Sequence, residues 1–447
     1  MNRFLTIIIL LLSVFILKAQ ETQVAQETQW SLDDCIRYAI KNSPRVNKQE
    51  AQNMIYHQDY RNAIGRLIPS LNAGTNSYFN FGRGVDSETN LYTNINSFSN
   101  SYSIYSNLTI FDGLSNIYRV KMEKANKLMG KELLDREREM VAYDTMEAFI
   151  NVLYYKRMVQ LAEEQAEESA NNLKQAERME ELGMRAKPDV AEMAAKQAAD
   201  NYNLTKQKNL LVIGIIILKE RMNFPIDEEI DLSDEYDNIL IIKSEGAAPE
   251  IYETAKIINP EALSAASVLR VQEMSMRVSA GGFSPVISMD AGISTGFVKY
   301  LDGSEYEPFT DQFKNKRGSY IGFTLSVPIF NGLSKSANYR KSKAMVDIAQ
   351  NEYDETLRTL YSEIEQVVAD VNGQADAYRQ ALFQREAMEV AHEANRRKYE
   401  EGLISPLELH TSANRVVEAK AEEMNAELQY RLKARLLDYY RGESFIK

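Results

Sequence analysis

The sequence has few of the side chains on which most catalysis and metal binding depend. It contains a single cysteine, Cys35, so no intrachain disulfide can form. The three histidines, His57, His392 and His410, are far apart and lack metal-ligand spacing. The chain also has no nucleophile elbow, phosphate-binding glycine-rich loop or dinucleotide fingerprint. We therefore expect no enzyme, no cofactor and no metal site.

Basic residues are outnumbered by acidic ones, 52 to 64, and long apolar runs are scarce. The net charge of -12 argues against a nucleic-acid partner, because phosphate binding needs clustered positive charge. The mean hydropathy of -0.39 argues against a protein with many transmembrane helices. The apolar run from Phe4 to Leu17 follows Arg3 and is shorter than the roughly 20 residues of a spanning helix. It predicts a secretory signal peptide over residues 1–20, with an uncleaved anchor as the alternative.

An internal repeat organises the rest of the chain. The segment Ile-Phe-Asp-Gly-Leu-Ser at 110–115 recurs as Ile-Phe-Asn-Gly-Leu-Ser at 329–334, an offset of 219 residues. The same offset pairs Gly183 with Gly402. A shorter motif, Asn42-Ser43-Pro44, recurs as Ile258-Asn259-Pro260. Self-similarity over such a distance indicates a duplicated structural unit.

Each copy is predicted to contain a helix, two strands, a long helix, a turn and a second long helix. The first helix should begin at Ser31 as N-cap and end near Ile64. The predicted segments are a first repeat over 21–222, an acidic insertion beside the helices over 223–258 with a short strand at 239–242, a second repeat over 259–442 and a tail over 443–447.

Four segments alternate between apolar and polar residues with the period of a β-strand, at about 70–82, 98–111, 286–298 and 318–330. A soluble sandwich would also show this pattern. Here the polar positions are small and uncharged and aromatic residues are frequent, which favours a membrane wall around a wet lumen. Four strands cannot close a barrel, but a homotrimer with twelve can. The side chains expected to face lipid are Tyr102, Ile104, Leu108, Ile321, Phe323 and Leu325.

The predicted helices are too long for a compact domain. Residues 114–183 contain no proline, and a continuous helix of that length would measure about 105 Å. From Tyr353 to Val371 the apolar residues follow the spacing of a coiled-coil seam. Gly183 and Gly402, each followed by a proline, should form the tips of two helical hairpins at about 113–222 and 332–441. The apolar run 210–218 is too short to span a membrane and is expected inside the assembly.

Three motifs carry a resemblance to a known family. They are Leu67-Ile68-Pro69-Ser70-Leu71, Val327-Pro328-Ile329-Phe330-Asn331-Gly332 and the eleven residues from Tyr399 to Leu409. With the duplicated plan, they make the chain similar to the TolC family of outer-membrane efflux proteins. The resemblance implies an α+β membrane protein: a trimeric twelve-stranded β-barrel, four strands per chain, in the outer membrane of a Gram-negative bacterium, continuing into a periplasmic α-helical coiled-coil barrel.

The resemblance also implies function and partners. Such a trimer is a passive exit duct of a tripartite efflux or type I secretion system, in contact with outer-membrane lipid. A periplasmic adaptor (membrane fusion protein) would dock at the hairpin tips, at Gly183, Gly402 and Pro406, and an inner-membrane transporter would supply the energy. The periplasmic gate of the family maps to Glu408 and Thr411, and in the first copy to Asp189 and Glu192. Threonine at position 411 departs from the acidic pattern of the family.

Two other classes of function are weighed against the channel. A periplasmic coiled-coil scaffold or adaptor without a pore would explain the long helices, but adaptors usually carry one hairpin and not two matched hairpins, each preceded by paired strands. An enzyme, such as a surface hydrolase, would need a catalytic constellation that the sequence lacks.

Overall fold

The computed structural model of the chain describes residues 29–85, 91–94, 96–233, 241–244, 246–303 and 305–446. The predicted signal peptide therefore lies outside the described residues. So does the first half of the strand predicted at 239–242, and the other half, Ile241 and Ile242, is not in a strand. The described residues form two compact units. One comprises those of Met1–Lys48, Arg136–Ala255 and Tyr361–Lys447, and the other comprises Gln49–Asp135 and Lys256–Leu360.

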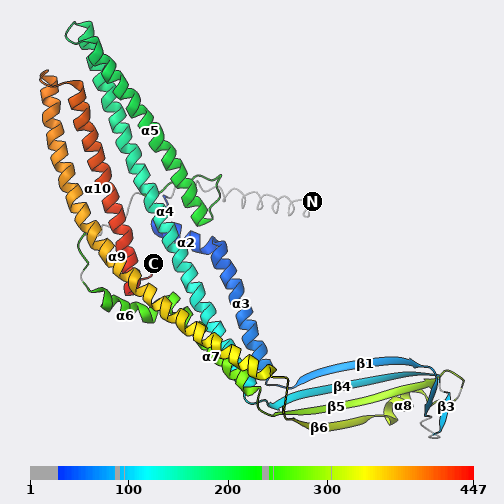
Figure 1. The fold of residues 1–447 in the computed structure, drawn as a ribbon. Coiled ribbons are helices and arrows are strands. Elements are labelled where there is room, and N and C mark those ends of the chain that lie inside the picture. Colours follow the sequence, from blue (N-terminus) through cyan, green and yellow to red (C-terminus); the bar gives the residue numbers. More distant parts are fainter. Residues whose placement is uncertain are drawn as a thin grey trace, which may run out of the picture. The chain divides into compact units, whose positions relative to one another are not determined.

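The helices confirm the duplication, because both copies contain helices of the same lengths in the same order (Figure 1). Each copy has helices of 11, 22, 67 and 36 residues. In the first copy these are α2 (Leu32–Asn42), α3 (Pro44–Gly65), α4 (Ser115–Glu181) and α5 (Lys187–Met222). In the second they are α6 (Ala248–Ile258), α7 (Pro260–Gly281), α9 (Ser334–Glu400) and α10 (Pro406–Arg441).

The helix expected from Ser31 to about Ile64 is two helices, α2 and α3. Ser31 caps α2 with a capping box in which Asp34 is the reciprocal partner. Ser43 then leaves the helical conformation, with φ -65° and ψ 123°, and Pro44 starts α3. The second copy has the same φ and ψ at Asn259, before Pro260. Proline disfavours the helical conformation of the residue before it, which explains both breaks.

Four long strands form one antiparallel sheet with the order β1-β4-β5-β6, and this confirms the predicted four strands per chain (Figure 1). They are β1 (Ser70–Asn80), β4 (Ser97–Phe111), β5 (Val286–Tyr300) and β6 (Gly318–Ser326). The two repeats meet in the middle of the sheet, where β4 pairs with β5. The strand predicted to reach position 330 ends at Ser326, two residues before Pro328, which has no N–H to donate to a partner strand.

Three short elements accompany the sheet. The strands β2 (Arg83–Val85) and β3 (Tyr92–Asn94) pair as a small ribbon. The helix α8 (Phe309–Asn315) lies between β5 and β6 in the chain. None of these elements was expected from the sequence.

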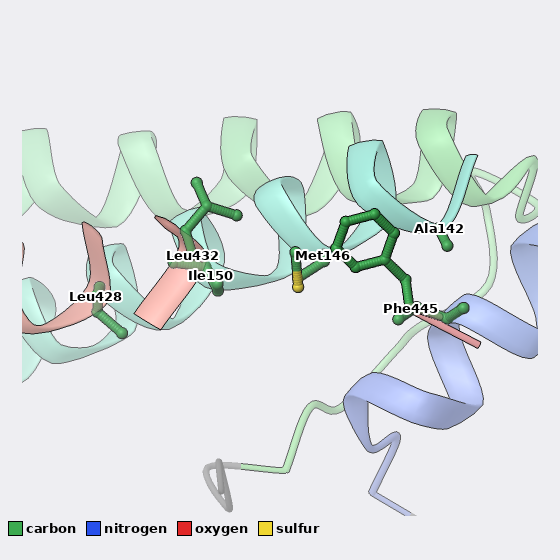
Figure 2. Close-up of a cluster of buried hydrophobic side chains, with 7 residues drawn as sticks. Ala142, Met146, Ile150, Leu428, Leu432 and Phe445 are labelled. Carbon is green, nitrogen blue, oxygen red and sulfur yellow. The ribbon is translucent and has the colours of Figure 1, made fainter. Parts of the chain in front are cut away.

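The unit that contains Arg136–Ala255 and Tyr361–Lys447 has its hydrophobic core around the middle of α4. Figure 2 shows Ala142, Met146 and Ile150 of α4 beside Leu428 and Leu432 of α10 and Phe445 of the tail. Ile36 of α2 completes this cluster, and all of its members are at most 5% exposed. Cys35, which precedes Ile36 on α2, is also fully buried. Phe445 also stacks on Tyr439, with ring centroids 4.8 Å apart, so the tail is part of the core.

Within the predicted acidic insertion, residues 248–258 form α6 of the second copy, and residues 242–243 contact α9 and α10. Tyr430 Oη donates to the carbonyl of Ile242 and accepts from its N–H. Lys243 forms a salt bridge of 2.7 Å with Asp376, which lowers the pKa of that carboxyl. None of the helices in the described part of the chain combines the length and the apolarity that crossing a bilayer requires.

Candidate functional site

The register of the sheet separates its side chains into two faces of different chemistry. Directly opposed residues share a face, as in the pair Ile104 and Ile293 and the pair Phe323 and Met289. We call the face with these residues the apolar face. The opposite, polar face carries mostly serine, asparagine, threonine, glycine and tyrosine.

All six side chains predicted to face lipid lie on the apolar face. Ile321, Phe323 and Leu325 of β6 are 64–72% exposed in the single chain. Burying a large apolar side chain is worth roughly 1.5–3 kcal/mol, so three such residues exposed in a row are costly in water. This face requires an apolar environment that the single chain does not supply.

The helix α8 covers part of the apolar face near the C-terminal end of β5. Phe313 and Phe309 pack edge-on against Tyr102, with ring centroids 5.6 and 6.2 Å apart. Gln312 is 2% exposed, and its side-chain amide accepts from the N–H of Val298 and donates to its carbonyl. Gln312 therefore hydrogen-bonds the backbone of β5 beyond Ser294, the last residue that pairs with β6. The contacts with Phe309 and Phe313 also mean that Tyr102 is partly covered by protein.

Both hairpin turns end their first helix in the same way. Gly183 and Gly402 have φ of 71° and 75°, the left-handed conformation that glycine adopts without strain. The N–H of Gly402 donates to Tyr399 O and that of Leu403 donates to Lys398 O, which is a Schellman motif. A proline in the first turn then starts α5 and α10.

The four predicted gate residues lie in the first two turns of α5 and α10, with Asp189 and Glu408 in the first turn. Glu408 is exposed, and its carboxylate accepts from Ser405 N at 2.9 Å in a capping box. Thr411 is exposed and donates to Leu407 O. Asp189 and Glu192 are half-buried. Glu408 therefore has a structural role at the start of α10 in addition to its charge.

Just behind the turns, side chains from both hairpins form one small core. Tyr399 and Met193 pack with Ala176 and Leu409, and all four are at most 7% exposed. The guanidinium of Arg185 lies 4.3 Å from the centroid of the Tyr399 ring. His410 Nε2 lies 3.0 Å from Met193 Sδ, and burial lowers the pKa of this histidine. We call this group the tip core.

A polar layer lies next to the tip core and also joins the hairpins. Lys196 of α5 forms a 2.6 Å salt bridge with Asp200 and donates to Asn414 of α10 at 2.8 Å. His392 of α9 contacts Ser412 Oγ at 2.9 Å and lies 3.7 Å from Glu168 of α4. The interaction with His392 lowers the pKa of Glu168.

Comparison with known proteins agrees with these features. Residues 251–442 match the family described as Outer membrane efflux protein. No curated protein sequence matches the chain significantly.

Several solved structures share the fold. The CmeC outer membrane channel of Campylobacter jejuni has a TM-score of 0.80 and 14% identity, over 93% of this chain and 87% of CmeC. The outer membrane protein VceC of Vibrio cholerae has a TM-score of 0.78 and 13% identity, over 93% and 96%. The open MtrE outer membrane channel of Neisseria gonorrhoeae has a TM-score of 0.75 and 16% identity, over 93% and 89%.

The family match falls on the second repeat, and the first repeat duplicates its helix lengths and turns. The shared fold extends over both. This family comprises efflux channels and not enzymes. Residues 251–442 thus match the outer membrane efflux protein family, the TolC family that the sequence motifs resemble, and the described chain shares its fold with the solved outer-membrane channels.

Proposed function

We propose that three copies of this chain join edge to edge into one twelve-stranded barrel. The barrel would form a passive duct through the outer membrane of a Gram-negative bacterium and continue into the periplasm as a helical barrel. The sheet carries this proposal, because it has one exposed apolar face, one polar face and two outer strands, β1 and β6, each paired on one side only among the described residues. Unpaired strand edges cannot remain in lipid, and closure removes them.

Exposed apolar residues on α5 support the same assembly. Val212, Ile213, Ile216 and Ile217 recur at helical spacing and are 42–55% exposed in the single chain. A contiguous apolar stripe of this kind is typical of a surface that another protein covers. We assign it to contacts inside the trimer.

Mass measurement and conductance together test the proposed duct. The purified mature protein in detergent should have three times the mass of the chain by light scattering, and it should form ion-conducting pores in planar lipid bilayers. Fractionation should recover it with the outer membrane. A monomer that dissolves without detergent and does not conduct would instead support the periplasmic scaffold.

We propose that the hairpin tips at Gly183, Gly402 and Pro406 receive a periplasmic adaptor, which couples the duct to an inner-membrane pump. Their exposed apolar residues support this docking role: Leu182, Met184, Leu403 and Leu407 are 62–73% exposed. In our proposal the pump supplies the energy and selects the substrate. Crosslinking from a cysteine at position 184 to a co-expressed adaptor tests the contact, and a cysteine at Val390, also exposed, is the control.

We propose further that the carboxylates of Glu408, with Asp189 and Glu192 behind them, form the periplasmic gate. Three converging Glu408 side chains would repel one another and attract cations. Thr411 adds no charge to this ring. Because Glu408 also caps α10, Glu408→Gln is the sharper variant: glutamine keeps the capping bond but removes the charge.

Single-channel recording of Glu408→Gln and Glu408→Ala tests the gate. Both variants should conduct more and select cations less than the wild type. If Glu408→Ala alone differs from the wild type, the residue acts as a helix cap and not as a charged gate. Unchanged conductance and selectivity in both variants would remove Glu408 from the gate.

A further inference from the structure

Charge is almost absent from the four long strands. Among their residues only Asp290 and Lys299, both on β5, carry one. Lys299 is opposed to Phe98 on the apolar face, and its ammonium lies 5.5 Å from the centroid of the Tyr306 ring. Asp290 is opposed to Asn107 and Gly322 on the polar face. The polar face of the four strands therefore carries a single charge, and it is negative.

The Asp290 carboxylate is held by a neutral partner. Asn107 Nδ2 of β4 donates to Asp290 Oδ1 at 2.7 Å. No lysine or arginine forms a salt bridge with Asp290 in the part of the chain that the structure describes. The hydrogen bond fixes the carboxylate without neutralising it, so its field acts on whatever occupies the space above the polar face.

The next row of the same face is bulky. Gly292 is opposed to Tyr105 on one side and to Tyr320 on the other. A Cβ at Gly292 would lie 2.8 Å from Tyr320 Cε1, so the Tyr320 ring lies across β5 at this glycine. Both tyrosines are about half exposed, at 46% and 54%. Successive rows of one face are about 7 Å apart along a strand, so these rings stand next to the Asp290 carboxylate.

We propose that Asp290 is a cation-selecting residue of the barrel, separate from the hairpin tips. This inference rests on the proposed trimeric duct, in which the polar face lines the lumen. Three Asp290 side chains would then form a ring of carboxylates near the end of the sheet where β5 begins, and six tyrosines in the next row narrow the lumen beside it. The ring favours inorganic cations and cationic organic substrates over anions.

The size of the effect follows from the dimensions of such a barrel. Twelve tilted strands about 4.8 Å apart give a circumference of about 75 Å, which places the carboxylates about 10 Å from the axis. That distance equals the Debye length of about 10 Å in 0.1 M salt and far exceeds the 3 Å in 1 M salt. Three charges at this distance raise the ratio of potassium to chloride permeability roughly fourfold in 0.1 M salt and scarcely in 1 M salt.

Reversal potentials of the reconstituted mature protein in potassium chloride gradients test the proposal. We compare the wild type with Asp290→Asn, which keeps the size of the side chain and loses the charge. A second variant, Asp290→Ser, carries the residue type found elsewhere on this face, in case the first does not assemble. The permeability ratio of each protein is also measured in the presence of the Glu408→Gln substitution, so that the charge at the hairpin tips cannot mask the result.

The expected result is a roughly fourfold lower permeability ratio for either Asp290 variant in dilute salt, in both backgrounds, with the difference disappearing in 1 M salt. An unchanged ratio in a variant that still forms pores overturns the role of Asp290 and leaves the duct intact. A wild type that forms no pores overturns the duct itself.

Discussion

Replacing Tyr399 by alanine should loosen the hairpin tips. The ring of Tyr399 is 7% exposed within the tip core, where it joins α9 to Met193 of α5 and lies under the guanidinium of Arg185. Removing a buried aromatic ring typically costs about 3–5 kcal/mol, and a cation–π contact adds about 0.5–2 kcal/mol. Because the tip lies at the end of the hairpins and can relax, we take the loss to be about 3 kcal/mol. This shifts the equilibrium between closed and separated tips roughly a hundredfold.

Two measurements check this prediction. Trypsin should cleave Tyr399→Ala faster than the wild type at Arg397 and Lys398, which are exposed beside the turn. The mean conductance of the reconstituted variant should also rise. Tyr399→Phe keeps the ring and should behave like the wild type. If Tyr399→Ala shows wild-type cleavage and wild-type conductance, the tip core does not hold the hairpins together and the reasoning is refuted.

Three further predictions concern single residues. Burial raises the pKa of the Cys35 thiol to about 12, so a maleimide at pH 8 should label this residue only after unfolding; rapid labelling of the native protein would contradict its burial. Burial lowers the pKa of His410 in the folded chain. As the pH falls below about 6.5, the unfolded chain therefore binds a proton at this histidine more readily than the folded chain does, and the free energy of unfolding decreases. Thermal unfolding from pH 8 to pH 5 should therefore show a smaller decrease for His410→Gln, and equal slopes would refute this. Gly113→Ala should prevent folding, because a Cβ there would lie 2.4 Å from Gly281 O. In contrast, no atom lies within 4 Å of a Cβ added at Gly332, so Gly332→Ala should cost only about 1 kcal/mol, from its left-handed backbone with φ of 63°. Similar melting temperatures for the two variants would contradict this difference.

Features written in local patterns could be predicted from the sequence. The alternation of apolar and polar residues predicted the strands, and the register then places Tyr102 and Ile321 on one face as expected. The turn glycines Gly183 and Gly402 could be recognised because a left-handed residue followed by proline is a strong local signal. The repeat was visible because both copies keep these signals at the same offset.

Features that depend on distant contacts could not be predicted. The pairing of Arg185 with Tyr399 joins residues of different hairpins, and neither residue type is unusual on a long helix.

Two other features had a local signal that was not used. The break at Ser43 had a signal in Pro44, which restricts the residue before it. The helix α8 also had one, because Phe309 and Phe313 are spaced for one helical face, but seven residues are too few for a clear period.

The pairing of β4 with β5 has a consequence for how the chain folds. Asn107 and Asp290 meet in the sheet although 183 residues separate them in the chain. The helical hairpin between them can form early from local contacts, whereas the central strand pair must wait until the second repeat has been synthesised and exported. A nascent chain that stops before β5 leaves β4 with a free edge, so premature termination should yield aggregation-prone fragments and not a smaller working pore.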